Sequence, residues 1–295
     1  IMRTISIFGS SGFIGAELIG QLAKKKNEIR VFTRNKIKAN HLKVLPNVKI
    51  VHYSDNSNLQ ELLKGTDVLI NLIGILHELK KNQFLNVHEG LTREIVKCAK
   101  KVNITRLVHI SALKCDTPGE SKYLFSKLRG EKAVTSLFKN KDWTILRPSI
   151  VYGPNDNFIN LFIKMIKFLP IFFLISPKAK FQPINVDDFV EIIIKVMDSK
   201  KSYKRILNIA GPKVFTFLEI IKLIKKTFNK KNIIIPLNKT FTIFFVRCLE
   251  ILPIKLVTRD NLKSMEIENT IDINDAYQYK SSLKQLSSYL KKISE

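Results

Sequence analysis

The chain has 295 residues, enough to bury a large core as one domain or as a domain with a smaller lobe. Its hydrophobic content of 45% is that of an ordinary globular protein, but its formal net charge is +25. Lysines scattered over the whole sequence supply most of this charge, whereas nucleic-acid readers gather arginine and aromatic residues on one face. The composition therefore does not indicate a specific nucleic-acid partner. We expect the positive charge to give weak contact with an anionic membrane surface.

The cysteines and the apolar stretches bear on the compartment of the protein and on membrane crossing. Cys98, Cys115 and Cys248 follow neither a metal-ligand spacing nor a paired framework, which suits a reducing compartment and predicts no metal site. The first residues already read as a strand, so we expect no signal peptide. Residues 158–176 predict an amphipathic helix followed by a buried extended segment rather than a membrane span. Residues 241–256 predict a surface helix whose apolar face meets the core, a partner or a bilayer surface.

Strand-like and helix-like segments alternate through the first half of the chain. Strands are predicted at 4–8, 29–33, 48–52, 67–72, 107–110 and 143–146, and helices at 16–26, 58–64, 84–101 and 123–138. This alternation predicts right-handed βαβ units and a parallel sheet covered on both faces.

The pattern loosens after Pro154. A strand at 183–186, a helix at 187–197, a strand at 207–209 and a helix at 217–228 are predicted, and residues 281–295 read as a polar helix or a frayed end. We therefore predict an α/β fold: a doubly wound parallel Rossmann sheet over residues 1–156 and a smaller C-terminal lobe over 157–295, with residues 181–199 packing back on the Rossmann domain.

A glycine-rich turn joins the first strand to the first helix. Gly9 permits a tight turn, Gly12 lets the backbone approach phosphates, and Gly15 lets the helix pack closely. The N–H groups and the dipole of a helix N-terminus favour an anion. The turn predicts a dinucleotide pyrophosphate site, formed by Gly9, Ser11, Gly12, Phe13, Ile14 and Gly15.

The end of the second strand bears on which dinucleotide binds. NAD-preferring sites place a carboxylate there for the ribose 2′-hydroxyl, but this strand ends at Arg34 with Lys36 and Lys38 beyond it. Arg34 is either one more surface cation or a bidentate partner for a 2′-phosphate, and we expect the second, hence NADPH (NADP) rather than NAD. Asp55, after the third strand, either accepts a hydrogen bond from the adenine amino group or lies solvated in its loop.

Three residues beyond the fourth strand suggest a site for proton transfer to or from a substrate. Ser111 ends the fifth strand, and Tyr123 and Lys127 are four residues apart on the next predicted helix, so they share a face. A Lys ammonium beside a Tyr hydroxyl lowers the pKa of the phenol, which can then exchange a proton with a substrate oxygen. We expect these three side chains to line the nicotinamide end of the pocket.

Together these motifs resemble the short-chain dehydrogenase/reductase superfamily in its extended or atypical branch. Asn86 matches the asparagine of that superfamily's active-site helix, and residues 146–154 resemble the segment that closes over the nicotinamide. The resemblance implies catalytic roles for Ser111, Tyr123, Lys127 and Asn86, and cofactor contacts from Leu72, Ile73, Gly74, Tyr123, Lys127 and Pro148.

Four further segments indicate which group within this branch the chain resembles: 71–76, 158–160, 181–188 and 258–262. In order and spacing they resemble the NADPH-binding accessory subunit of respiratory complex I and its bacterial relatives. This resemblance implies a fixed NADPH, a structural or quinone-linked role, and complex I subunits or quinone-biosynthesis proteins as partners. It also implies a cytoplasmic location, peripheral on the cytoplasmic face of the inner membrane, or on the matrix side in a mitochondrion.

Alternatives stay open at this point. One is a free-standing NADP-dependent oxidoreductase or epimerase that uses Tyr123 as acid and base, and another is a redox-sensing or RNA-binding Rossmann protein without catalysis. Among the remaining polar residues, His109 reads as a satisfied core histidine, and Asp187 and Asp188 read as the start of a helix rather than as metal ligands.

Overall fold

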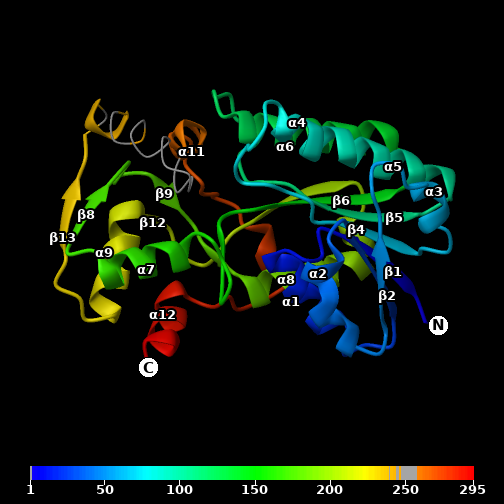
Figure 1. Cartoon of the computed structure of the whole chain (residues 1–295), viewed down its shortest axis with the longest axis horizontal. Coiled ribbons are helices and arrows are strands. Elements are labelled where there is room, and N and C mark those ends of the chain that lie inside the picture. The colour runs from blue at the N-terminus through cyan, green and yellow to red at the C-terminus, as the bar shows by residue number, and fades with distance from the viewer. Residues whose placement is uncertain (1, 239, 244–245, 247–257) are drawn as a thin grey trace. The chain divides into compact units, whose positions relative to one another are not determined.

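The structure, a computed structural model, describes residues 2–238, 240–243, 246 and 258–295 (Figure 1). The chain divides into two compact units that interleave along the sequence. The first comprises Ile1–Ser111, Ser126–Arg147 and Val190–Leu207, and the second comprises Ala112–Phe125, Pro148–Phe189 and Asn208–Glu295. Residues 112–125 and 148–156, which the predicted boundary at 156 assigns to the Rossmann domain, thus group with the second unit.

A seven-stranded sheet forms the centre of the fold, in the order β11-β6-β5-β4-β1-β2-β3. Its strands are β1 (Thr4–Phe8), β2 (Glu28–Thr33), β3 (Val48–His52), β4 (Val68–Asn71), β5 (Arg106–Ile110), β6 (Asp142–Pro148) and β11 (Arg205–Ile209). The pairs from β3 through β2, β1, β4 and β5 to β6 are all parallel. Since the strand order reverses between β1 and β4, this is a doubly wound Rossmann sheet, and the predicted fold class is confirmed.

Helices cover both faces of this sheet (Figure 1). One face carries α1 (Phe13–Leu22), α2 (Lys36–Ala39) and α8 (Val186–Asp198), and the other carries α3 (Leu59–Leu62), α4 (Gln83–Leu85), α5 (Thr92–Lys101) and α6 (Lys122–Leu137). Every residue of β4 and β5 is buried, as two covered faces require. Short 3-10 turns lie at Asn40–Val44, Lys200–Ser202 and Asp275–Gln278.

The helix predicted over 84–101 is present but not uniform. A π-helical turn, η2 (Asn86–Leu91), separates α4 from α5. Such turns change the direction in which neighbouring side chains point and are frequent at functional sites. Here the turn contains both Asn86, which the sequence singled out, and His88, which it did not.

The second unit is built from helices and small sheets. Its helices are α7 (Ile159–Phe168), α9 (Phe217–Thr227), α11 (Arg259–Met265) and α12 (Leu286–Ser294). Its two-stranded sheets pair β7 (Val151–Tyr152) with β10 (Ile184–Asn185), β9 (Lys180–Phe181) with β12 (Phe215–Thr216), and β8 (Ile171–Leu174) with β13 (Ile233–Pro236). Side chains of α7, α9 and α12 share one core with Phe172 and Leu174 of β8.

One predicted feature of this unit needs correction. The extended segment predicted to be buried is strand β8, but its side chains alternate: Phe172 and Leu174 are buried, whereas Ile171 and Phe173 are exposed. Of the two forms predicted for the tail, a polar helix or a frayed end, the structure has the helix, α12, and Leu290 on it is fully buried. The surface helix predicted at 241–256 lies mostly outside the described residues.

The structure also bears on membrane crossing. Among the residues that it describes, no helix combines the length and the apolar composition that a membrane span requires.

Candidate functional site

The glycine turn is packed so closely that only glycine fits at two of its positions. Gly9 has a φ of 76°, and a Cβ at this residue would lie 2.7 Å from the carbonyl carbon of Leu72. A Cβ on Gly15 would lie 2.6 Å from the Cα of Ser10. The Ser10 hydroxyl is buried and donates to the carbonyl of Phe32 at 3.1 Å. The turn is therefore fixed between β1, β2 and the loop after β4.

The first turn of α1 is suited to an anion. Gly12 is the N-cap, and its N–H donates to the Gly9 carbonyl at 3.2 Å. The next N–H groups have no acceptor within a helix, and the first turn of α1 contains no acidic residue. Ser11 and Gly12 are exposed, so a phosphate can approach the backbone. These features suit an anion such as a pyrophosphate, and the roles of Gly9 to Gly15 stay a prediction.

Arg34 and Asp55 lie beyond the ends of the neighbouring strands β2 and β3, and both are exposed. Both charges act on the buried Tyr53: burial raises the pKa of its phenol, Arg34 lowers that pKa and Asp55 raises it. The Tyr53 ring packs edge-on against Phe8, with centroids 5.4 Å apart. The carboxyl ends of β1, β2 and β3 thus present the glycine turn, an arginine and a carboxylate at one edge of the sheet.

The loop after β4 is held at three successive points. The N–H of Leu72 donates to the carbonyl of Phe8 at 2.9 Å. The N–H of Ile73 donates to the side chain of Asn71 at 3.1 Å, and the N–H of Ile75 donates to Nε2 of His88 at 3.0 Å. The loop is therefore anchored to its own strand, to β1 and to the π-helical turn.

Gly74 sits between two of the buried basic side chains. A Cβ on Gly74 would lie 3.7 Å from Nε2 of His88 and 3.8 Å from Nζ of Lys127. The Lys127 ammonium donates to the carbonyl of Ile110 at 2.7 Å. Ser111, the next residue in the chain, is buried directly after β5.

Tyr123 does not have the lowered pKa that the sequence predicts. Burial, with a smaller contribution from the nearby Cys115, raises the pKa of its phenol to about 12. The ammonium of Lys127 is directed at the Ile110 carbonyl, which limits its effect on the phenol. The phenol therefore stays protonated at neutral pH.

The hydrogen bonding of His109 also differs from the prediction. It is buried on β5, and neither ring nitrogen has a hydrogen-bond partner in the part of the chain that the structure describes. Burial lowers its pKa well below the ordinary value, with Lys127 and His88 lowering it further. The prediction of a satisfied core histidine is wrong, and burial, more than the positive charge of Lys127, favours the neutral imidazole.

His88 is the main residue that the sequence reading missed. Because Nε2 accepts the Ile75 N–H, Nδ1 carries the proton and donates to the Ser126 hydroxyl at 2.7 Å. Burial, with a smaller contribution from the positive charge of Lys127, lowers the pKa of His88 to about 3. Asn86, which the resemblance marked, is exposed. The available signal was a polar residue on the otherwise apolar face of the predicted helix.

A second missed residue is Asp260 on α11. Its carboxylate accepts the N–H groups of Lys122 at 2.6 Å and Tyr123 at 3.1 Å, and the Ser121 hydroxyl at 3.2 Å. Segment 258–262 carried part of the family resemblance, but nothing in the sequence pairs it with the start of α6. Pro148, at the end of β6, is buried, and its carbonyl accepts the N–H of Leu113 at 2.9 Å.

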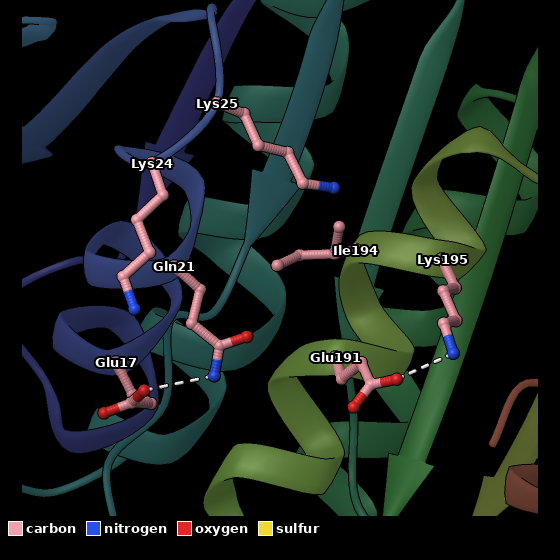
Figure 2. Close-up of a pocket in the computed structure, with 7 residues that line it drawn as sticks. All are labelled: Glu17, Gln21, Lys24, Lys25, Glu191, Ile194 and Lys195. Atoms are coloured by element: carbon pink, nitrogen blue, oxygen red, sulfur yellow. Dashed lines mark hydrogen bonds and ion pairs between the residues drawn. The ribbon is translucent and has the colours of Figure 1, made fainter.

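A separate hollow of about 360 Å³ lies between α1 and α8 (Figure 2). Two pairs of its lining side chains contact each other within a helix: Gln21 donates to Glu17 at 3.1 Å, and Lys195 lies 2.7 Å from Glu191. It borders the later turns of α1 and not the glycine turn that opens this helix. We interpret it as a solvated surface groove.

The reversal of strand order between β1 and β4, with a glycine turn at that point, defines an NAD(P)-binding Rossmann protein. The chain belongs to the NAD dependent epimerase/dehydratase family, which it matches over residues 5–210.

Two of the relatives are subunits of respiratory complex I. The 40 kDa subunit of mitochondrial NADH-ubiquinone oxidoreductase from Neurospora crassa is 25% identical over 235 residues, which cover 78% of this chain and 61% of the relative. The mitochondrial NADH dehydrogenase (ubiquinone) 1 alpha subcomplex subunit 9 of Arabidopsis thaliana is 28% identical over 229 residues, which cover 74% of this chain and 56% of the relative. The chain thus spans about three fifths of the length of the relatives that it matches. The predicted resemblance is confirmed.

Solved structures share the fold. UDP-glucuronic acid 4-epimerase from Bacillus cereus in complex with NAD has a TM-score of 0.78 at 20% identity, covering 98% of this chain and 96% of that one. An NADPH-dependent quinone oxidoreductase from Escherichia coli complexed with NADPH has a TM-score of 0.79 at 15% identity, covering 99% and 100%. One neighbour holds NAD and the other NADPH, so these matches establish an NAD(P)-binding fold without choosing between the two nucleotides.

Proposed function

We propose that this chain holds NADPH as a fixed ligand in an accessory role to respiratory complex I or to quinone metabolism. Its location would be peripheral to the inner membrane, on the cytoplasmic face in a bacterium or the matrix side in a mitochondrion. The observation that carries the proposal is the rigid glycine turn beside Arg34. The similarity to complex I subunits supports the accessory role.

Rigidity of the nucleotide site favours tight binding. The turn contacts β2 through Ser10, and the loop after β4 is held by Asn71 and His88. Segments that are already ordered lose little conformational entropy when a ligand binds, so more of the contact energy appears as affinity. Gly9 to Gly15 would hold the pyrophosphate, and Arg34 would pair with the 2′-phosphate.

The raised pKa of the Tyr123 phenol favours a permanently bound NADPH over a catalytic reaction that consumes it. NADPH supplies hydride chemistry when bound, and a reductase of this kind needs a phenol that exchanges its proton readily. Here burial raises the pKa of Tyr123 to about 12, and the Lys127 ammonium is bound to the Ile110 carbonyl. A protonated phenol and an engaged lysine suit a fixed nucleotide environment.

Native mass spectrometry tests this proposal. The tagged protein would be purified from its own cells under gentle lysis, and its bound nucleotide and partners recorded together. We expect NADP(H) at one per chain, with respiratory or quinone-biosynthesis proteins in the same membrane-associated fraction. A protein that stays in the soluble fraction with no such partner would contradict the accessory role, and a protein without nucleotide would contradict the fixed ligand.

A second candidate is a free-standing NADP-dependent oxidoreductase or epimerase. It is favoured by the Lys127 ammonium, which donates to the carbonyl of Ile110, the residue directly before the buried Ser111. In this case the Ser111 hydroxyl would bind the substrate oxygen and Tyr123 would donate a proton to it, as a phenol with a raised pKa can still do. The test is nucleotide turnover with quinones and nucleotide sugars, wild type beside Tyr123→Phe. Tyr277→Phe, at an exposed position, is the matched control.

A further inference from the structure

The imidazole of His88 is held on three sides within the first unit. Its Nε2 accepts the N–H of Ile75 at 3.0 Å, and its Nδ1 lies 2.7 Å from the hydroxyl of Ser126. The ring of Phe84 stacks on it, with centroids 5.6 Å apart and planes inclined by 20°. Both ring nitrogens and one ring face are thus occupied, so these contacts fix the orientation of the imidazole.

A close approach of α6 brings Ser126 to this imidazole. Ser126 and Gly130 are four residues apart on α6, so they share a face of the helix. A Cβ on Gly130 would lie 2.5 Å from the backbone carbonyl oxygen of His88, so only glycine lets α6 lie this close to the π-helical turn η2. Ser126 itself is fully buried. The contact between Ser126 and His88 is therefore part of the packing of α6 against η2.

The contact with Ser126 bears on the tautomer of His88. A neutral imidazole carries one proton, and the hydrogen bond at one nitrogen decides which nitrogen holds it. Burial, with a smaller contribution from Lys127, lowers the pKa of His88 to about 3, so the ring is neutral at physiological pH. With the proton on Nδ1, Nε2 can accept the N–H of Ile75. The other tautomer would set the Nε2–H against this N–H and lose the bond.

Ile75 belongs to the loop after β4, and the start of this loop packs against the glycine turn. A Cβ on Gly9 would lie 2.7 Å from the carbonyl carbon of Leu72 and 2.9 Å from the backbone nitrogen of Ile73. The two backbones are therefore in direct contact, with no side chain between them. Leu72 and Ile75 are parts of one short loop, so a displacement at Ile75 reaches the backbone on which the glycine turn rests.

We propose that His88 is a positioning residue of the nucleotide site and that Ser126 acts through it. The Ser126 hydroxyl keeps the proton of His88 on Nδ1, and Nε2 then holds the N–H of Ile75. The loop, fixed in this way, keeps the glycine turn in the form that binds the pyrophosphate. The hydrogen-bonding capacity of residue 88, and not its bulk, then sets the affinity for NADPH. This inference deepens the function proposed above and rests on it.

Fluorescence titration of NADPH into variants of the full chain tests the proposal. His88→Leu fills the space but offers no acceptor to the buried N–H of Ile75, so we expect it to weaken binding about tenfold. His88→Gln, whose side-chain carbonyl can accept this N–H, should bind within about twofold of wild type. Ser126→Ala should weaken binding about threefold. Ser136→Ala, at an exposed position of the same helix, and His41→Leu, also exposed, are the controls.

Imidazole nitrogen NMR of the isotopically labelled chain without nucleotide tests the tautomer directly. The signals of His88 are identified as those that His88→Gln lacks. We expect the Nδ1–H tautomer in the wild type and a mixture of both tautomers in Ser126→Ala. Amide hydrogen exchange at Ile75 should be faster in Ser126→Ala than in the wild type, because its acceptor is lost in part. A role of Ser126 in packing alone would not change the tautomer.

Thermal unfolding checks that each variant is folded, and Ser126→Ala carries the test if His88→Leu does not fold. The Nε2–H tautomer in the wild type, or NADPH binding that neither His88→Leu nor Ser126→Ala weakens, overturns the proposal. Equal losses in His88→Gln and His88→Leu assign His88 to packing alone and overturn it as well. A wild-type chain that binds no nucleotide overturns the proposed function together with this inference, whereas the other outcomes leave the proposed function standing.

Discussion

The carboxylate of Asp260 accepts the backbone N–H of Tyr123 at 3.1 Å, in the first turn of α6. It also accepts the N–H of Lys122 and the hydroxyl of Ser121. The first N–H groups of a helix have no acceptor within the helix, and a negative charge there is favoured by the helix dipole. Asp260 therefore fixes the turn that carries Tyr123, although α11 lies far along the chain.

Replacement of Asp260 by alanine removes this cap. We expect Asp260→Ala to lower the free energy of unfolding by about 0.5–2 kcal/mol, as the loss of a helix cap does. Amide exchange at Lys122 and Tyr123 should accelerate, because both N–H groups lose their acceptor. Denaturant unfolding and hydrogen exchange measure the two effects. Asp272→Ala, at an exposed position, is the control, and equal behaviour of both variants would show that the cap contributes nothing.

The two glycines Gly15 and Gly20 of α1 provide a matched pair. A Cβ on Gly15 would lie 2.6 Å from the backbone of Ser10, whereas a Cβ on Gly20 would meet nothing within 4 Å. We expect Gly15→Ala to displace the turn and weaken NADPH binding by at least about tenfold, since the turn is the proposed phosphate site. Gly20→Ala should leave binding unchanged and stabilise the helix by up to about 1 kcal/mol. Fluorescence titration and thermal unfolding distinguish these outcomes; unchanged binding in Gly15→Ala would contradict the assigned phosphate site.

The sequence predicted the sheet well because its strands are short buried runs separated by amphipathic helices. Strand β3 was predicted with the bounds that the structure has, Val48–His52. The carboxyl ends of parallel strands lie at one edge of a sheet, so chain order alone places Gly9, Arg34 and Ser111 at that edge. Local pattern and topology were sufficient for the position of these residues, and their roles stay predictions.

Residues that act through tertiary contacts were not predictable in this way. His88 reaches Ile75 because a π-helical turn interrupts the helix, and a period of 3.6 residues does not reveal such a turn. Asp260 meets Tyr123 through the folding of the second unit, which has no repeating pattern. The raised pKa of Tyr123 likewise depends on burial, and the sequence shows only that Lys127 is four residues away.

His88 predicts a dependence of stability on pH. Burial lowers its pKa to about 3 in the folded chain, against an ordinary value of 6.5. Between these values the unfolded chain binds a proton that the folded chain does not, so stability is complete above about pH 6.5 and falls as the pH drops toward 3. The slope contributed by His88 reaches about 1.4 kcal/mol per pH unit. The pKa of His109 is lowered too, so its contribution has the same sign.

Replacement of His88 by glutamine removes one of these two contributions. We expect His88→Gln to flatten the fall in stability at acid pH while its side-chain carbonyl still accepts the Ile75 N–H, so that nucleotide binding at neutral pH is largely retained. Denaturant unfolding across the pH range measures the slope. His52→Gln, at an exposed position on β3, is the control. An identical slope in wild type and His88→Gln would show that His88 titrates alike in the folded and unfolded chains.

We expect Arg34 to decide between the two nucleotides. It is exposed beyond the end of β2, where NAD-preferring proteins of this fold place a carboxylate. Hydrogen bonds to charged groups contribute about 1.5–3 kcal/mol, so Arg34→Ala should weaken NADPH binding by roughly tenfold to a hundredfold and leave NADH binding nearly unchanged. Arg34→Asp should go further and reverse the preference, since its carboxylate repels the 2′-phosphate and can accept the 2′-hydroxyl. Lys36→Ala is the control for a general loss of positive charge. An equal loss of affinity for both nucleotides in Arg34→Ala would remove this residue from the 2′-phosphate and leave the choice of nucleotide to other residues.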